Sequence, residues 1–314
     1  MPTLLRRLNP FRSDRRRWGR RHNPDGTMTL VDHLYELRYR LGVALVAVVI
    51  GGAFGFWWFS HSWLGIPELG GIMTRPYCQL PAELRFSPNG KCQLLQTKPF
   101  EAFTLQLKVG VSIGAVLLSP VWLYQIWAFI TPGLYQKERR LAGTFVVLAS
   151  VLFIAGAVLA YFVVPAGLGF MASFGGGSFF MALSGGDYIN FVLLLLVIFG
   201  VSFELPLVVV MLNRAGLVSY ERLKSWWRGI VFALFVFAAV ATPGGDPFSM
   251  LALALTLTAL FGGALLVCRQ QDRMKVGKLD QVGVDEPSQL DARPSELDTA
   301  PAEVSRADLR DDAT

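Results

Sequence analysis

A single ionisable side chain, Glu204, stands in the apolar run FVLLLLVIFGVSFELPLVVVML, residues 191–212. Ser202 precedes it by two positions and Pro206 follows it by two. Because proline has no backbone N–H, Pro206 removes the helical hydrogen bond to the Ser202 carbonyl and opens the helix beside the acid. An ionised carboxylate in hydrocarbon costs about 3 kcal/mol, so Glu204 is expected to be protonated, paired with a polar group or open to water.

Two interpretations of Glu204 stay open. One is a neutral acid that is hydrogen-bonded within its own helix bundle and stabilises the fold. The other is a carboxylate that serves binding of a partner or translocation. No Lys or Arg lies at matching depth in another apolar run, so an internal salt bridge is not expected. A polar partner would then be water or another chain, and we favour the second interpretation.

Two further carboxylates, Glu36 and Glu138, belong to the basic segments HLYELRYRL and LYQKERR. Each has an ordinary interpretation: Glu36 pairs with Arg40 one helical turn later, and Glu138 is a solvated loop residue. Two carboxylates that lie near each other could instead receive two guanidinium groups through charge-assisted hydrogen bonds. Spacing alone favours the ordinary interpretations.

The sequence lacks the motifs of the common enzyme classes. Its three histidines, His22, His33 and His61, have no helical spacing between any two of them, which argues against a histidine-based metal site. There is no G-x-S-x-G, P-loop or HExxH motif. The apolar runs hold one carboxylate, whereas a membrane hydrolase needs a buried serine or a carboxylate pair. We therefore predict no enzyme, no metal site and no cofactor.

Composition predicts an all-α, polytopic membrane protein. Of the 314 residues, 53% are hydrophobic and 17% are charged, and the mean hydropathy is +0.45. Six apolar runs predict six transmembrane helices, of which the last two are short. A re-entrant hairpin, joined through ATPGGDPFS, is the alternative for that last pair. The runs are Leu41–Phe59, Val109–Ile130, Leu141–Val164, Phe191–Leu212, Gly229–Ala241 and Pro247–Cys268.

Lysine and arginine residues concentrate in alternate segments. The segment before the first run holds ten of the 29, the loops 131–140 and 213–228 hold three and four, and the tail holds seven. The loop 165–190 and the TPGGDP turn hold none. By the positive-inside rule both termini are therefore cytoplasmic. The pI of 9.4 reports this topology and does not indicate nucleic-acid binding.

The chain divides into three predicted regions. Residues 1–28 form a basic, disordered cytoplasmic arm on the anionic inner leaflet. Residues 29–268 form the membrane domain, which starts with an amphipathic helix over residues 29–40 because leucines recur there at spacings of three and four. Residues 269–314, with 11 acids against seven bases, form a charged, disordered cytoplasmic tail.

Cys78 and Cys92 lie together in the long loop after the first span, which is predicted to face the outer compartment. If that compartment is oxidising, the pair can close a disulfide worth about 3 kcal/mol. Two free thiols are the equal alternative at this point.

Several of these stretches, in the same order, resemble the TatC family, the multispanning receptor subunit of the twin-arginine protein translocase. HLYELRYRL resembles the family's HLxELRxRL, and SPVWLYQIWAFITPGLYQKERR resembles its second span and first cytoplasmic loop. AYFVVPAGLGF resembles the end of the third span, FGVSFELPLVVVML the fourth span, and TPGGDPFS the turn between the last two. The resemblance covers about residues 29–268.

The resemblance implies a receptor in the bacterial cytoplasmic membrane that recognises folded cargo proteins through an N-terminal signal peptide bearing paired arginines. It implies that Glu36 and Glu138 bind those arginines, and that the motif residues Arg38, Phe129 and Pro132 belong to the same site. Transport would use the proton-motive force, in agreement with the lack of a nucleotide-binding motif.

The resemblance also implies contacts with other chains. Glu204 would line a concave face of the bundle and meet a polar residue in the transmembrane helix of a TatA or TatB type subunit. Asp246 would help partner helices dock near the outer turn. The implied partners are these single-span subunits, twin-arginine signal peptides, lipids and further copies in a complex, with no nucleic acid.

Two other functions are compatible with the residues alone. A small-solute or proton-coupled transporter would use Glu204 as a proton carrier, and a structural membrane scaffold would need none of the three glutamates. The lack of an internal repeat and of inverted broken helices argues against the transporter.

Overall fold

The structure is a computed structural model in which every described element is helical, apart from two isolated β-bridges. This confirms the all-α prediction for those residues. The basic arm and most of the acidic tail lie outside them. The chain divides after Arg269 into two units, and the packing discussed below belongs to the first. The described residues are 30–82, 90–130, 139–173 and 183–281.

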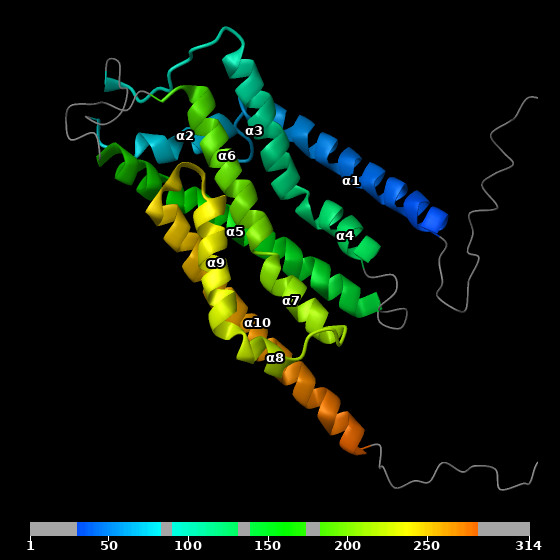
Figure 1. Cartoon of the computed structure of the whole chain (residues 1–314). Coiled ribbons are helices and arrows are strands. Elements are labelled where there is room, and N and C mark those ends of the chain that lie inside the picture. Colours follow the sequence, from blue (N-terminus) through cyan, green and yellow to red (C-terminus); the bar gives the residue numbers. More distant parts are fainter. Residues whose placement is uncertain (1–29, 83–89, 131–138, 174–182, 282–314) are drawn as a thin grey trace, which may run out of the picture. The chain divides into compact units, whose positions relative to one another are not determined.

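Figure 1 shows the helices, coloured along the sequence. In chain order they are α1 (Leu30–Trp58), α2 (Leu69–Cys78), α3 (Glu101–Leu117), α4 (Ser119–Ile130), α5 (Arg139–Ser173), α6 (Gly185–Ser202), α7 (Leu205–Arg214), α8 (Tyr220–Ser225), α9 (Trp227–Ala241) and α10 (Pro247–Gln281), with a 3-10 turn, η3 (Pro243–Gly245), before α10.

Four stretches among the described residues are long and apolar enough to cross a membrane: His33–Trp58, Gly143–Ser173, Gly185–Arg214 and Pro247–Met274. The third of them runs through α6 and α7. Helices α3 and α4 together make a fifth candidate, bent by 62°. Helix α9 is apolar but has only 15 residues. The chain is thus a multi-pass membrane protein, whereas six full spans and the cytoplasmic termini stay predictions.

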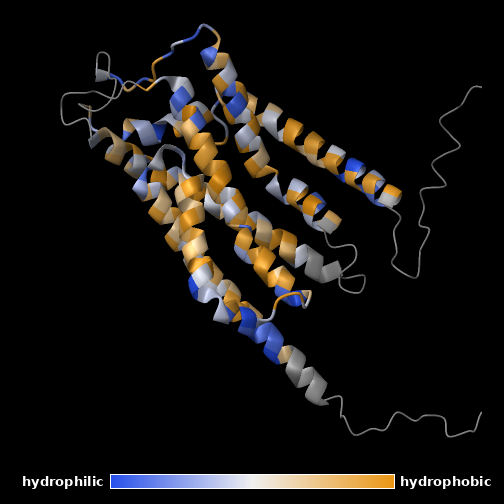
Figure 2. Ribbon diagram, viewed as in Figure 1, coloured by the Kyte–Doolittle hydropathy of each residue, from blue (hydrophilic) through white to orange (hydrophobic). Residues whose placement is uncertain are grey.

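The prediction that both last spans are short is correct for α9 and wrong for α10. The candidate span in α10 has 28 residues. The helix also continues past Cys268 to Gln281, because the polar residues that follow contain no proline to end it. Figure 2 shows α10 changing from hydrophobic to hydrophilic along its length. The predicted tail therefore begins as helix.

Helices α1 and α3 cross where glycine backbones touch. Gly51 and Gly55 on α1 are four residues apart, as are Gly110 and Gly114 on α3. A Cβ added at Gly51 would lie 2.5 Å from the Gly114 carbonyl oxygen, and one at Gly110 would lie 2.5 Å from the backbone nitrogen of Phe56. Small residues at this spacing let two membrane helices approach closely. The crossing holds the first span against the bent second one.

The bend between α3 and α4 has its own support. Pro120 lacks a backbone donor and interrupts the helical hydrogen bonds there. The Trp122 indole N–H donates to the Ala115 carbonyl at 2.8 Å, and the Trp122 ring meets Phe153 of α5 edge-on at 5.2 Å. Trp122 therefore fixes the direction in which α4 leaves α3.

Helix α6 packs against both α5 and α3. Its contact with α5 is close because a Cβ at Gly156 would lie 2.6 Å from the Phe199 carbonyl oxygen. The large side chains buried between these helices are apolar or tyrosine, and they form the main core of the first unit. They include Val164, Tyr188, Val192, Leu195 and Phe199.

Candidate functional site

Glu36 lies on α1, just before the apolar part of the helix. Its side chain is 24% exposed. Arg40 donates two hydrogen bonds to a single oxygen, Glu36 Oε1, from Nε at 2.9 Å and from Nη2 at 2.5 Å. Among the described residues nothing bonds the other oxygen, Oε2. The predicted pairing with Arg40 is thus confirmed, and Arg38 of the same segment is exposed.

Phe129, near the end of α4, stacks on His33 of α1. The ring centroids are 4.4 Å apart and the planes differ by 17°. His33 and Glu36 are three positions apart and share a helix face. The contact holds the end of α4 against the segment of α1 that carries Glu36. Sequence reasoning missed it, because the two residues are far apart along the chain. Glu138 and Pro132 follow in the chain and lie outside the described residues.

Glu204 lies at the break between α6 and α7. Helix α6 ends at Ser202 and α7 begins at Leu205, followed by Pro206, which has no N–H to donate. Both oxygens of the Glu204 carboxylate are buried, and neither has a hydrogen-bond partner within the part of the chain that the structure describes. A buried carboxylate without partners is costly. That water or another chain completes this polar site stays a prediction.

Next to the buried Glu204 carboxylate, one face of α6 and α7 is exposed with respect to the described residues. Val197, Val201 and Val208 lie on the same face, at seven and three positions before Glu204 and four after it, and they are 50%, 53% and 38% exposed. The acid thus interrupts an exposed apolar stripe of α6 and α7. Such a stripe fits lipid tails or the apolar side of another transmembrane helix.

Asp246 is 1% exposed and immediately precedes α10. Its Oδ1 accepts a hydrogen bond from the Ser249 N–H at 2.8 Å, so the side chain caps its own helix. A Cβ at Gly167 of α5 would lie 3.0 Å from the same oxygen. Oδ2 is buried without a hydrogen-bond partner among the described residues. In this conformation Asp246 faces inward, and its contact with a partner helix stays a prediction.

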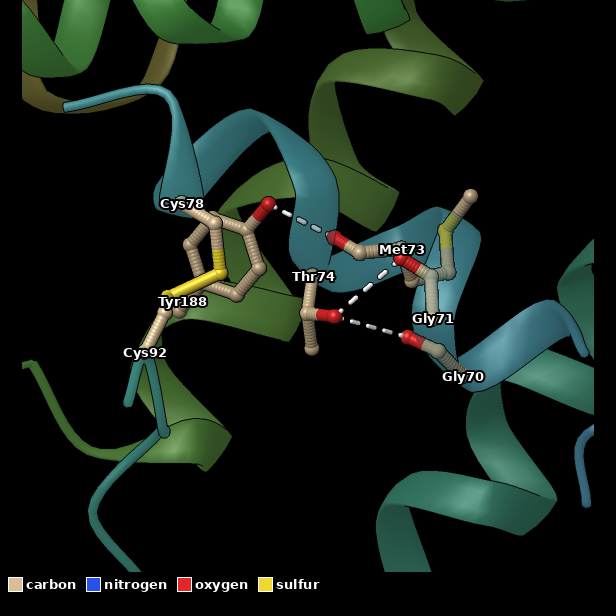
Figure 3. Close-up of a disulfide and its surroundings, with 7 residues drawn as sticks. All are labelled: Gly70, Gly71, Met73, Thr74, Cys78, Cys92 and Tyr188. Atoms are coloured by element: carbon tan, nitrogen blue, oxygen red, sulfur yellow. Dashed lines mark hydrogen bonds between the residues drawn. A yellow bond between two sulfur atoms is a disulfide. The ribbon is translucent and has the colours of Figure 1, made fainter. Parts of the chain in front are cut away.

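Cys78 and Cys92 are joined by a disulfide, with Cα atoms 5.8 Å apart (Figure 3). Cys78 ends α2, a helix that contains Pro76. Because Pro76 has no N–H, the Ile72 carbonyl loses its helical donor. The Tyr161 hydroxyl of α5 donates to that carbonyl at 2.8 Å. The disulfide and the tyrosine thus fix α2 at both ends.

A second tyrosine, Tyr188 of α6, donates its hydroxyl to the Met73 carbonyl at 2.7 Å (Figure 3). Its ring is fully buried and lies against Tyr77 of α2, with centroids 5.6 Å apart. Helix α2 is therefore attached to α5 and α6 through the hydroxyl groups of the half-buried Tyr161 and the buried Tyr188. Local sequence patterns gave no sign of these bonds, because the partners are about 90 and 115 positions apart.

Sequence analysis did not single out Glu101, whose two carboxylate oxygens both accept hydrogen bonds. Its Oε2 accepts from the backbone N–H groups of Thr97 at 2.6 Å and Lys98 at 3.0 Å. Its Oε1 accepts from the Gly186 N–H at 2.6 Å. Glu101 thus joins the start of α3 to the start of α6, and its role is structural. Glu204 differs in having no such bonds.

The described residues contain no group of three or more His, Cys, Asp or Glu side chains that could hold a metal ion. The described residues instead include a carboxylate at the start of α1, Glu36, that is paired with Arg40. A second carboxylate, Glu204, lies inside a candidate span and has no hydrogen-bond partner among them. Such groups suit recognition of cationic and polar partners.

A sequence model described as "Sec-independent protein translocase protein (TatC)" matches residues 32–255. The chain belongs to the TatC family. The TatC protein of Corynebacterium kroppenstedtii is 46% identical over 283 residues, which cover 85% of this chain and 68% of that one. The TatC protein of Frankia casuarinae is 44% identical over 279 residues, which cover 85% and 74%.

TatC has also been crystallised. A crystal structure named "Twin Arginine Translocase Receptor- TatC" matches this fold with a TM-score of 0.61 and 31% sequence identity, and the match covers 75% of this chain and 99% of the other. As a member of the TatC family, the chain is a membrane subunit of a protein translocase. It is a transport protein and not a known enzyme.

Proposed function

We propose that this chain is the membrane core and signal-peptide receptor of a twin-arginine translocase, which exports folded proteins across the bacterial cytoplasmic membrane. Family membership supports the translocase role, and the name of the matching crystal structure describes that protein as a receptor. One observation carries the assignment to residues. The His33–Phe129 stack brings the end of α4, from which the chain continues to Glu138, against the turn of α1 that holds Glu36.

In this proposal Glu36 and Glu138 receive the two arginine side chains of the signal peptide. A carboxylate binds a guanidinium through two directional, charge-assisted hydrogen bonds, which a lysine ammonium reproduces poorly. Phe129 supports the site by holding α4 against α1. Arg38 and Pro132 complete it as neighbours of the two acids in sequence.

The proposal places six spans in the membrane and both termini in the cytoplasm, because the lysine and arginine residues concentrate in alternate loops. Glu36 and Glu138 then both face the cytoplasm, where signal peptides are made. The disulfide-linked helix α2 lies outside, in an oxidising compartment.

Glu204 is the contact for a single-span TatA or TatB type subunit. Its unbonded carboxylate and the exposed valines beside it support this role, since a polar side chain of a neighbouring helix would satisfy the acid. Asp246 is a second proposed contact, which would require its buried side chain to become accessible. Export draws on the proton-motive force, as the family resemblance implies and in agreement with the lack of a nucleotide-binding motif in the sequence.

Export from membrane vesicles that contain this chain and its single-span partners tests the function. We expect a folded reporter with a twin-arginine signal to be exported at least about tenfold faster than its twin-lysine version, because lysine loses the bidentate bonds. An ionophore should stop this export. The Glu36→Gln variant should lose it, while Glu221→Gln, a change in an exposed acid of α8, should not.

Equal export of the two reporters, or export that survives the ionophore, would contradict the proposal. Ion-coupled uptake of a small solute by the purified chain alone, with no response to signal peptides, would favour the transporter instead.

A further inference from the structure

The carboxylate proposed to bind a signal arginine already holds an arginine of its own chain. Both donors of Arg40 go to one oxygen, Glu36 Oε1, at 2.9 and 2.5 Å. The two side chains are only 21% and 24% exposed. Oε2 stays without a bond among the described residues. Within the described part of the chain, one oxygen of the carboxylate is therefore bonded and the other is not.

We propose that Arg40 sets the preference of this site for arginine over lysine. It does so by pairing with the Glu36 carboxylate in the way that an arginine of the signal peptide would. An incoming cation has to share the carboxylate with Arg40 or displace it. The inference rests on the proposed function and adds a residue to it. Arg38 does not take this role, because it is exposed and two positions from Glu36, which puts it on another side of the helix.

The physical reason lies in what an arginine and a lysine gain from a carboxylate. Both gain Coulomb attraction, and Arg40 largely cancels that gain because its positive charge sits on the same group. Only the guanidinium adds a rigid, planar set of N–H donors, which can still bond Oε2 or replace Arg40 on Oε1. Arg40 thus removes most of the Coulomb attraction that any basic residue would gain. The directional hydrogen bonds, which favour arginine, remain available.

Position on α1 makes Arg40 suited to this task. It is one turn from Glu36 on the same helix, so forming the pair orders no additional chain segment. His33, on the same face, is stacked on Phe129 and holds this part of α1 against α4. The pair is consequently formed in advance, and it is weak enough for a ligand to replace.

The test compares binding of twin-arginine and twin-lysine signal peptides to the purified full chain in detergent. Wild type, Arg40→Gln and Arg40→Met are measured, the last because it keeps the aliphatic stem. Arg222→Gln, in an exposed arginine of α8, is the control. We expect both Arg40 variants to bind the twin-lysine peptide about tenfold and the twin-arginine peptide about threefold more tightly. The effect is larger for lysine because its ammonium is a point charge that depends on Coulomb attraction, which Arg40 no longer reduces. Their preference for arginine therefore falls about threefold.

An unchanged preference in both Arg40 variants would overturn the inference and leave the proposed function intact. Weaker binding of both peptides by one common factor would also overturn the inference and leave the proposed function intact, because Arg40 would then only support the fold. If the wild type binds both peptides equally, the proposed function fails, and the inference fails with it. Arg222→Gln should match the wild type in affinity and in preference.

Discussion

Replacing Glu204 with leucine raises the stability of the purified chain and abolishes its assembly with single-span partners. Both carboxylate oxygens of Glu204 are buried without a hydrogen-bond partner among the described residues. Replacing such a group with an apolar side chain removes a desolvation penalty of about 1 to 3 kcal/mol. The same change removes the group that a polar residue of another chain would meet. Thermal unfolding in detergent and co-purification of the partners measure the two effects.

Glu101 provides the matched control, because it is a carboxylate whose bonds are all made inside the chain. Glu101→Leu should lower the unfolding temperature, since three backbone N–H groups lose their acceptor. A Glu204→Leu variant that unfolds at lower temperature and still assembles would show that Glu204 stabilises its own bundle. That was the alternative interpretation left open by the sequence.

Gly51→Ala, a single added methyl group, destabilises the membrane domain by about 3 kcal/mol. The new Cβ would lie 2.5 Å from the Gly114 carbonyl oxygen, which is backbone and has no rotamer to change. Helices α1 and α3 would have to separate, and the neighbouring contact of Gly55 with Gly110 would be lost. The yield of monodisperse protein and its unfolding temperature report the effect.

Gly42→Ala is the control for this change. Gly42 lies on the same helix, and nothing stands within 4 Å of an added Cβ. This variant should be as stable as the wild type or slightly more stable, because alanine favours a helix over glycine. If Gly51→Ala is as stable as Gly42→Ala, the close crossing of α1 and α3 is not required for the fold.

The sequence predicted the long apolar helices well, because the bilayer allows few alternatives, whereas it did not predict the short helices α2 and α8. A run of apolar residues long enough to cross it must form a helix that satisfies its own backbone groups. The opening beside Glu204 was also predictable, since Pro206 lacks a donor wherever it stands. The length of α10 was not predictable, because the end of a polar helix depends on weak local preferences.

Contacts between distant segments were largely beyond the sequence. The Gly51–Gly114 crossing and the Tyr188–Met73 bond each join residues that are far apart along the chain. Apolar periodicity shows which face of a helix is buried, but it does not show against which helix. The His33–Phe129 stack was missed for the same reason, although it is the contact that brings two parts of the candidate site together.

For the site, local spacing predicted the pair of Glu36 with Arg40 and nothing more. The roles proposed for Glu36 and Glu138 came from the family resemblance. Glu204 is the exception, because the cost of burying a charge already pointed to a partner from outside the chain.

Binding of a twin-arginine signal peptide to the purified chain tests the central claim most directly. The comparison uses a twin-lysine peptide and the double variant Glu36→Gln, Glu138→Gln. The proposed receptor should bind the arginine peptide at least about 30-fold more tightly than the double variant does, because each lost carboxylate leaves a guanidinium unpaired. It should also prefer arginine to lysine. Equal binding of the two peptides, or undiminished binding by the double variant, would contradict the receptor function assigned to these carboxylates.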